Sequence, residues 1–537
     1  MINSQQEGLY RLNSNSGEQI ALKSVEIIGQ VEGWILTKTL RQKYQNNTDE
    51  TLEVSYAFPV SYGEVLLAMN VTLDDKKLAA KVIERKRANE QYEDAIEKGD
   101  TPIMVELNDE SGIATVNLGN LKPNAIAELE IVSAIPLRFA QGKIRFALPA
   151  TIAPRYGDPI KDGGMREHDA VNVDAGAEYP LTIRIELQDA AAHAAVSSPS
   201  HAIKMKQEHE KTIVTLAKAA FLDRDFILIL DDIKETSTTL IAPDENEFMT
   251  QTTFYAPIAN NTDPIFLKIL VDCSGSMGGD SIAVAKRALK RIAAELTDKD
   301  FITYSRFGSS VEHKFSTPTR CSADVLKKLN FEIDQTDANL GGTEMERALL
   351  DVFKLSDKKQ DAPSAQVLLI TDGEVWNSAG VTNSAKISGH RVFVVGVGAS
   401  SAEHTLNNLA KETGGAYESI SPNESGAEVI TRSFYKMRGG ELRDVKIKWD
   451  KKPLWESELP KIIYCGETLR VFAQFQSPPE KPPVLSYVIA TEKKELTSTT
   501  FAKTDNPIIT KLGGAKKYDD TQSHESKLEL SLRYQLL

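Results

Sequence analysis

A short apolar run that ends in a turn of small polar residues is the feature that most constrains the fold of this chain. Residues 265–271 are almost continuously apolar, which is typical of a strand buried on both faces of a parallel sheet. The run ends in Asp272-Cys273-Ser274-Gly275-Ser276, and an amphipathic helix follows. The apolar face of that helix is formed by Ala285, Ala288, Leu289, Ile292, Ala293 and Leu296. This order places the polar turn at the carboxyl end of a strand, where open α/β sheets bind ligands.

The segment 264–437 continues with the same alternation of strand and helix patterns, which predicts a doubly wound parallel sheet. We expect three of its loops to follow the carboxyl ends of strands. They contain Asp272-x-Ser274-x-Ser276, Gly341-Gly342-Thr343 and Thr371-Asp372-Gly373. Right-handed crossovers would bring all three loops to the same edge of the sheet.

These loops offer two carboxylates and three hydroxyls, with no histidine or cysteine in a ligand pattern. Oxygen donors of this kind suit a hard cation such as Mg²⁺ or Mn²⁺. Because hydroxyl ligands are neutral, the cation would keep most of its charge and attract an oxyanion from outside. The first loop alone could be an ordinary turn, since Asp and Ser are common turn residues. The three loops together, in this order, predict a metal site.

The same pattern resembles the metal-ion-dependent adhesion site of von Willebrand factor A domains. All five positions of that motif are present: Asp272, Ser274, Ser276, Thr343 and Asp372. The resemblance implies that Ser274, Ser276 and Thr343 contact the metal directly. It implies that the two aspartates act directly or through water, and that an Asp or Glu of a protein partner completes the coordination.

Other kinds of site have less support in the sequence. The glycines around 275–279 fit neither common nucleotide-binding loop, and the eight histidines show no paired spacing. A phosphohydrolase with Asp272 as nucleophile usually needs a second carboxylate two positions later, where Ser274 stands. Cys273 is expected to be a packed, unreactive thiol. We therefore predict no catalytic residue and no organic cofactor.

The first block, 1–159, reads mainly as strands with one helix over 84–99, which indicates a β-sandwich. Four landmarks in it resemble the VIT domain, the N-terminal module of inter-α-trypsin inhibitor heavy chains. They are Tyr56-Ala57-Phe58-Pro59, Ala88-x3-Tyr92-x2-Ala95-x3-Gly99, Val116-x-Leu118-Gly119-Asn120-Leu121-x-Pro123 and Ala153-Pro154-Arg155-Tyr156. We interpret them as residues of turns and core, without chemistry of their own.

Two further blocks with strand patterns flank the central segment, at 160–263 and 438–500. Three or four strands rarely form a stable domain alone, so we expect the two flanks to build a second β-sandwich. The von Willebrand A domain would then be inserted between them, because the ends of a compact domain often lie close together. The structure of residues 501–537 is left open, because the part over 511–537 fits either a helix or a strand.

Composition narrows the function further. The 537 residues have a net charge of −13, which argues against binding of nucleic acid or anionic membranes. The polar N-terminus has no signal-peptide pattern, no apolar run is long enough to cross a membrane, and three scattered cysteines suggest no disulfide framework. These features favour a cytoplasmic protein.

The sequence thus predicts a multidomain VIT and von Willebrand A domain protein that binds a protein partner through a divalent metal. Its oligomeric state and the identity of the partner are left open. The alternative is an assembly factor that uses the same metal site with a partner ATPase; a Mg²⁺-dependent phosphohydrolase is the less favoured one.

Overall fold

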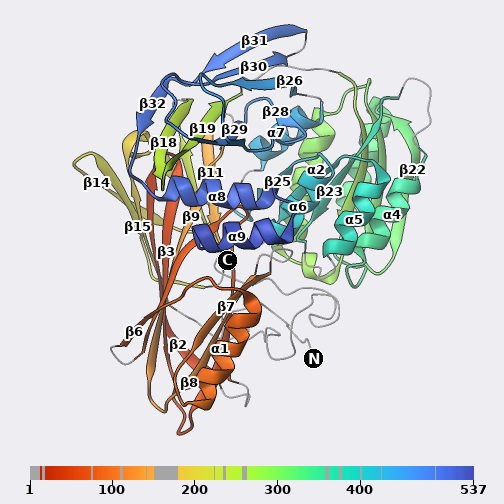
Figure 1. The fold of residues 1–537 in the computed structure, drawn as a ribbon. Helices are drawn as coiled ribbons and strands as arrows, with labels where there is room; N and C mark the ends of the chain where they lie inside the picture. Colours follow the sequence, from red (N-terminus) through yellow and green to blue (C-terminus); the bar gives the residue numbers. More distant parts are fainter. Residues whose placement is uncertain are drawn as a thin grey trace.

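The computed structural model describes residues 12–14, 19–73, 76–108, 113–140, 142–149, 180–222, 224–233, 237–256, 263–356, 362–373, 378–398, 402–424, 426–438, 440–489 and 491–536. Three parts are visible in Figure 1. Long twisted strands form the N-terminal part, an α/β domain lies beside them, and a second β region bears two C-terminal helices across its surface.

The N-terminal part is built around thirteen strands in one branched sheet. Nine of them follow the order β6-β5-β9-β3-β2-β1-β4-β8-β7. These are β1 Leu12–Ser14, β2 Gln19–Glu32, β3 Ile35–Gln45, β4 Leu52–Pro59, β5 Val65–Leu73, β6 Lys76–Ala79, β7 Ile103–Asn108, β8 Ile113–Leu121 and β9 Ile126–Pro136. The branch contains β12 Pro180–Leu187, β14 Ile203–Glu208, β15 Lys211–Leu216 and β16 Ala220–Phe221.

The branch begins where β12 pairs in parallel with the later half of β2, from Leu181 opposite Val25 to Leu187 opposite Val31. A separate sheet, β10-β11-β17-β13, shares the same hydrophobic cluster as β2, β3 and β12. Its strands are β10 Phe139–Ala140, β11 Lys143–Leu148, β13 Ala195–Ser197 and β17 Phe226–Asp231.

The predicted block 160–263 is therefore divided, and only its last strands lie with the segment that follows the α/β domain. Buried and exposed positions alternate along β12, so one face of this strand must be buried. The alternation does not indicate which strand β12 pairs with. In the structure, β12 pairs with the unpaired edge of the later half of β2, and the sequence pattern could not predict this partner.

The VIT landmarks occupy structural positions in this part. Helix α1 (Arg85–Glu97) lies on β8, and a Cβ added at Gly119 would come within 2.0 Å of the Cδ1 atom of Ile96. Asn120, with a φ of 52°, donates from its amide to the Asp100 carbonyl (2.6 Å). Gly99, with a φ of 74°, follows the helix as predicted. The fourth landmark, 153–156, lies outside the described residues.

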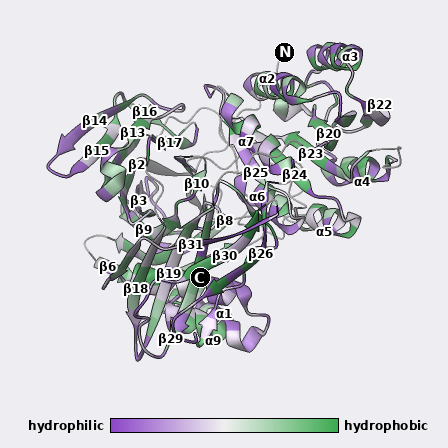
Figure 2. Ribbon diagram, turned by 90° about the horizontal axis from the view of Figure 1, so that it is seen from above, coloured by the Kyte–Doolittle hydropathy of each residue, from purple (hydrophilic) through white to green (hydrophobic). Residues whose placement is uncertain are grey.

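The α/β domain has the sheet order β22-β21-β20-β23-β24-β25, parallel except for the edge strand β22. Its strands are β20 Phe266–Asp272, β21 Phe301–Phe307, β22 Val311–Arg320, β23 Ala365–Thr371, β24 Val392–Val397 and β25 Tyr417–Ile420. Its helices are α2 Asp280–Glu295, α3 Ala323–Asp334, α4 Met345–Lys354, α5 Ser378–Ser388, α6 Glu403–Glu412 and α7 Ala427–Met437. Figure 2 shows the sheet between α2, α3 and α7 on one side and α4 and α5 on the other.

The sequence pattern of the first strand and helix is confirmed. All seven residues of β20 are buried, and so is the whole predicted apolar stripe of α2 with Leu296. Strand β22 and helix α5 were not anticipated, because β22 is largely exposed and α5 has only a weak apolar stripe. A parallel sheet covered by helices on both faces is the architecture that buries a strand such as β20 completely.

The second β region contains a five-stranded sheet, β27-β29-β19-β18-β32, drawn from both flanks of the α/β domain. Phe248–Tyr255 pairs antiparallel with Thr468–Phe475 across more than two hundred residues of sequence. The strands of this five-stranded sheet are β18 Thr238–Asp244, β19 Glu247–Tyr255, β27 Trp455–Glu456, β29 Thr468–Phe475 and β32 Thr500–Lys503. A four-stranded sheet shares a hydrophobic cluster with it and contains β26 Glu441–Lys448, β28 Ile463–Tyr464, β30 Val484–Ile489 and β31 Glu492–Thr497.

After β32, the C-terminal segment forms two helices, α8 (Ile508–Asp520) and α9 (His524–Tyr534). The part whose pattern fitted either a helix or a strand is therefore helical. Helix α8 contacts β5, β18 and β19, so it joins the N-terminal part to the second β region (Figure 1). Within the described residues, no helix combines the length and the apolar character that a membrane span requires.

Two ion-pair groups, one largely buried and one half-buried, attach the α/β domain to its neighbours. Glu418 on β25 accepts from Arg432 (2.9 Å) and Lys436 (2.9 Å) of α7, and Lys436 also pairs with Glu467 just before β29. Arg145 of β11 donates to both carboxylate oxygens of Glu424 at 3.1 Å. These contacts fix the last strand and helix of the domain against both β regions.

Candidate functional site

The first candidate loop leaves the carboxyl end of β20 in a tightly bonded turn. The Ser274 N–H donates to Asp272 Oδ1 (2.9 Å), and the hydroxyls of Ser274 and Ser276 lie 3.1 Å apart. Asp272 and Ser274 are buried, whereas Ser276 is exposed. A 3-10 turn over Gly275–Met277 then leads to α2. The turn thus brings two hydroxyl oxygens to one place at the end of a buried strand.

Asp272 is held by hydrogen bonds at both carboxylate oxygens. Oδ2 accepts from the Thr371 hydroxyl at 2.6 Å, while Oδ1 accepts from the Ser274 N–H. Burial raises the pKa of Asp272, and the hydrogen bonds from Thr371 and Ser274 oppose that rise. Asp272 therefore ties the first loop to the end of the neighbouring strand β23.

The loop with Thr343 reaches the same edge by a route that differs from the prediction. Residues 341–343 lie between helices α3 and α4 rather than after a strand. Backbone hydrogen bonds attach this loop to the first one: Leu340 N–H donates to the Cys273 carbonyl (2.9 Å), and Gly275 N–H donates to the Gly341 carbonyl (2.7 Å). The strand-end expectation was wrong for this loop because Gly and Thr mark a turn without revealing what precedes it.

Two glycines make that attachment possible. A Cβ at Gly308, after β21, would lie 2.4 Å from the Leu340 carbonyl oxygen, so the two backbones can approach only at a glycine. Gly341 has a φ of 83°, and the adjacent Gly342 N–H donates to the Ser309 hydroxyl (2.8 Å). Thr343 follows directly and is buried.

The third loop follows β23. Thr371 and Asp372 are buried, the Gly373 N–H donates to the Thr371 hydroxyl (3.0 Å), and the Asp372 carbonyl accepts from the Ala402 N–H (3.1 Å). Thr371, whose hydroxyl bonds to Asp272, therefore links the loop that contains Asp372 to the first loop. The structure brings Asp272, Ser274 and Ser276 into direct contact, and it joins Thr343 and Asp372 to them through neighbouring residues.

The donor set fits a hard divalent cation. Its donors are all oxygen atoms, supplied by two carboxylates and three hydroxyls, which are the groups that Mg²⁺ and Mn²⁺ prefer. Nowhere in the described ranges do three or more His, Cys, Asp or Glu residues gather as a metal-binding group. A cation held here would therefore depend on hydroxyl ligands rather than on a cluster of carboxylates.

Sequence reasoning missed the supporting residues. Gly308 and Ser309 belong to a turn with no motif, and their contact with the Thr343 loop arises only in the folded domain. Thr371 stood in the third motif, yet its hydrogen bond to Asp272 depends on the pairing of β20 with β23. Cys273 packs in the core as expected, and burial raises the pKa of its thiol to about 12.

Comparison with known proteins identifies both modules. Residues 22–132 match the vault protein inter-alpha-trypsin (VIT) domain, and residues 266–419 match the von Willebrand factor type A domain. A von Willebrand factor A domain-containing protein of Dictyostelium discoideum is 25% identical over 478 residues, covering 86% of this chain and 50% of that protein. The von Willebrand factor A domain-containing protein 5A of Homo sapiens is 24% identical over 502 residues, covering 85% and 62%.

Among solved structures, the von Willebrand factor type A protein from Catenulispora acidiphila aligns with a TM-score of 0.34 at 14% identity. That alignment covers 64% of this chain and 80% of the other. This chain spans about half the length of the Dictyostelium relatives that it matches.

Proposed function

We propose that this chain, which is a VIT and von Willebrand factor A domain protein, binds a protein partner through a divalent cation at the edge of its α/β sheet. Von Willebrand factor A domains are generally protein-interaction modules and commonly bind a divalent metal at this site. The observation that carries the proposal is that the Thr343 loop and the loop after β23 are each hydrogen-bonded to the first loop, which contains Asp272.

The hydrogen bonds of the five candidate residues indicate which of them would bind the cation directly and which through water. Ser274, Ser276 and Thr343 would supply hydroxyl oxygens to the cation, with Asp372 beside them. Asp272 already accepts one hydrogen bond at each oxygen, so it would orient the first loop and bind the cation through water. Bound there, Mg²⁺ or Mn²⁺ would supply a positive charge that the neutral hydroxyls leave largely uncompensated.

That residual charge defines the partner by its chemistry. A carboxylate from an Asp or Glu of another protein would both neutralise the cation and complete its octahedron. We further propose that the A domain corresponds to 264–437, inserted within a β region formed by its flanks, and that the protein acts in the cytoplasm. The reaction is association rather than catalysis, so no phosphate ester or ATP should be hydrolysed.

Thermal unfolding with the metal alone tests the cation site. Millimolar Mg²⁺ or Mn²⁺ should raise the midpoint of the full chain, since a ligand at one hundred times its Kd contributes about 2.7 kcal/mol. Asp272→Asn and Thr343→Ala should abolish the rise. Asp298→Ala is the matched control, because Asp298 is exposed and precedes β21 at the opposite end of the strands.

If the metal does not change the midpoint of thermal unfolding of the wild-type chain, or raises it equally in the Thr343→Ala variant, the cation site is contradicted. A Mg²⁺-dependent hydrolysis of ATP or p-nitrophenyl phosphate that disappears in Asp272→Asn contradicts the binding function and supports a phosphohydrolase instead.

A further inference from the structure

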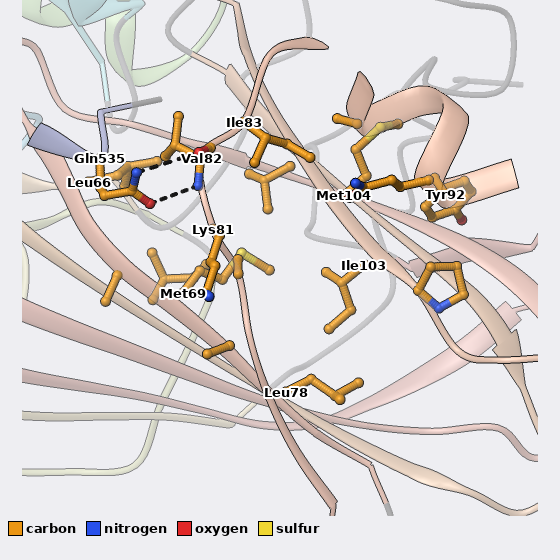
Figure 3. Close-up of a pocket in the computed structure, with 18 of the residues that line it drawn as sticks. Leu66, Met69, Leu78, Lys81, Val82, Ile83, Tyr92, Ile103, Met104 and Gln535 are labelled. Atoms are coloured by element: carbon orange, nitrogen blue, oxygen red, sulfur yellow. Dashed lines mark hydrogen bonds between the residues drawn. The ribbon is translucent and has the colours of Figure 1, made fainter. Parts of the chain in front are cut away.

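The N-terminal part contains a cavity of about 470 Å³, far from the proposed cation site in the sequence. Figure 3 shows the side chains around it, which come from β5, β6, the connection 80–84, α1 and β7. Phe58 of β4, Ile131 of β9, residues 101–102 before β7 and Gln535, which follows α9, complete the lining. The volume lies within the range of about 300–1,000 Å³ that is usual for small-molecule sites.

The cavity exists because the strand path does not close. Strands β6 and β7 are the two ends of the nine-strand path, and both contribute to the lining. The connection 80–84 and helix α1 pass over the opening between them, with Ala88 and Tyr92 turned to the cavity. The incomplete closure of a sheet around apolar side chains is a common origin of ligand sites in β proteins.

The lining is mainly aliphatic and includes two methionine side chains. Its apolar members include Leu66, Met69, Leu78, Ile83, Ile103 and Met104. Two of its polar members are engaged: the Tyr92 hydroxyl donates to Glu53 (3.0 Å), and the Gln535 side chain accepts from Val82 N–H (3.1 Å) and donates to the Leu532 carbonyl (2.8 Å). An apolar ligand would therefore displace no hydrogen bond made by these two side chains.

Lys81 is the one charged residue among those that line the cavity, and none of them is a carboxylate. Its side chain is exposed, and it forms no ion pair with any other described residue. Neighbouring Lys77, by contrast, lies outside the lining and has its Nζ 3.7 Å from Glu130. The cavity thus combines an apolar interior with a single cation at its edge.

We infer that this cavity binds the acyl chain of a fatty carboxylate, with the carboxylate at Lys81. The apolar wall accepts methylene groups, and Lys81 offers the charge that selects an anionic head over a cationic one. A peptide would need polar partners along its whole backbone, and the hydrogen-bonding groups of Tyr92 and Gln535 are already in use. Gln91 and Thr101 are the other uncharged polar side chains of the lining, which is too few for that purpose. The site is independent of the cation proposed for the α/β domain.

Calorimetric titration of the full chain with decanoate, dodecanoate and tetradecanoate, each below its micelle concentration, tests the inference. Burial of each methylene should raise the affinity about fourfold until the cavity is full. Lys81→Ala should weaken dodecanoate about fivefold and leave dodecanol unchanged, since only the acid carries a charge. Lys77→Ala is the matched control and should alter neither.

Filling the cavity provides a second test. Ala88→Phe on α1 and Ala80→Trp on the exposed connection each add volume there, so each should abolish dodecanoate binding; the second keeps the test valid if the first does not fold. Affinity that ignores chain length, or survives both filled variants, overturns the inference. Binding to phosphatidylserine vesicles with no binding of monomeric dodecanoate also overturns it and points to a membrane surface.

Discussion

The α/β domain and the N-terminal β part end their sheets in opposite ways. At the carboxyl edge of the α/β sheet, backbone and hydroxyl groups bond two loops to the loop that follows β20. At the opening between β6 and β7, aliphatic side chains face a cavity of about 470 Å³. A parallel sheet collects its loops at one edge, whereas an incompletely closed antiparallel sheet leaves side chains without neighbours.

This difference between the two regions shows which kind of functional site can be recognised from the sequence. Polar residues at a strand end form a motif, because short spacings in sequence become short distances in space. An apolar cavity has no such motif, because its residues are those of any sheet core. The two regions also use glycine differently: Gly308 admits a backbone, while Gly119 admits the end of a side chain.

The largest effect should come from the ion pairs that attach the α/β domain. Glu418→Ala leaves buried Arg432 without its carboxylate and leaves Lys436 with Glu467 alone, which should lower the free energy of unfolding by about 3–5 kcal/mol. Urea denaturation measures this loss. Glu492→Ala, which breaks an exposed pair with Lys494, is the control and should cost less than about 1 kcal/mol.

The pH dependence of the same carboxylate sharpens that test. Lys436 and Arg432 lower the pKa of Glu418 to about 2 despite its burial, so the folded value lies below the unfolded one. The stabilisation is therefore complete above about pH 4.5 and is lost as the pH falls toward 2. The difference in unfolding free energy between wild type and Glu418→Gln should be constant from pH 5 to 7 and shrink below 4.5. A difference that grows on acidification would contradict this assignment.

Gly308→Ala should have the next largest effect. The new Cβ would meet the Leu340 carbonyl, a backbone group that cannot rotate away, so the loop with Thr343 must shift at a cost of up to about 3 kcal/mol. The variant should also lose the Mg²⁺-dependent rise in melting temperature. Ser310→Ala on the same turn should keep that rise; equal behaviour of the two variants would refute the role of Gly308.

Arg145→Ala removes a contact between the N-terminal part and the α/β domain. It removes two hydrogen bonds to Glu424 and others to Ser419 and Ser421, so we expect a loss of about 2 kcal/mol. Limited proteolysis should then cut between the two parts sooner than in wild type. Lys143→Ala, whose pairs with Asp231 and Glu428 are more exposed, should change the cleavage rate less.

Gly119→Ala should have the smallest effect of the series, about 1 kcal/mol. The atom nearest to a new Cβ is the terminal methyl of Ile96, which can rotate or be removed. The next nearest atoms, Cδ and Cγ of Pro102, lie at 3.2 Å and need to shift by only a few tenths of an ångström. The double variant Gly119→Ala with Ile96→Val should recover most of the loss, measured as a double-mutant cycle. A loss as large as that of Gly308→Ala, without recovery, would erase the distinction between the two regions.

Local patterns were sufficient for much of the α/β domain and its candidate site. The buried strand β20, the apolar stripe of α2 and the contact between Ser274 and Ser276 follow from neighbouring residues in the chain. Local patterns were not sufficient to place the Thr343 loop, because its position depends on Gly308 and Ser309 of a separate turn. The strand β22 and helix α5 were missed for lack of a strong apolar pattern.

The sequence by itself determined the two modules, the oxygen-rich motif and the helix over residues 84–99, because each depends on side chains close together in the chain. Only the tertiary structure decided that β12 joins β2, that β19 pairs with β29, and that β6 and β7 leave a cavity between them. The physical reason is that strand periodicity specifies which face is buried, whereas the partner of each edge is chosen by packing over the whole chain.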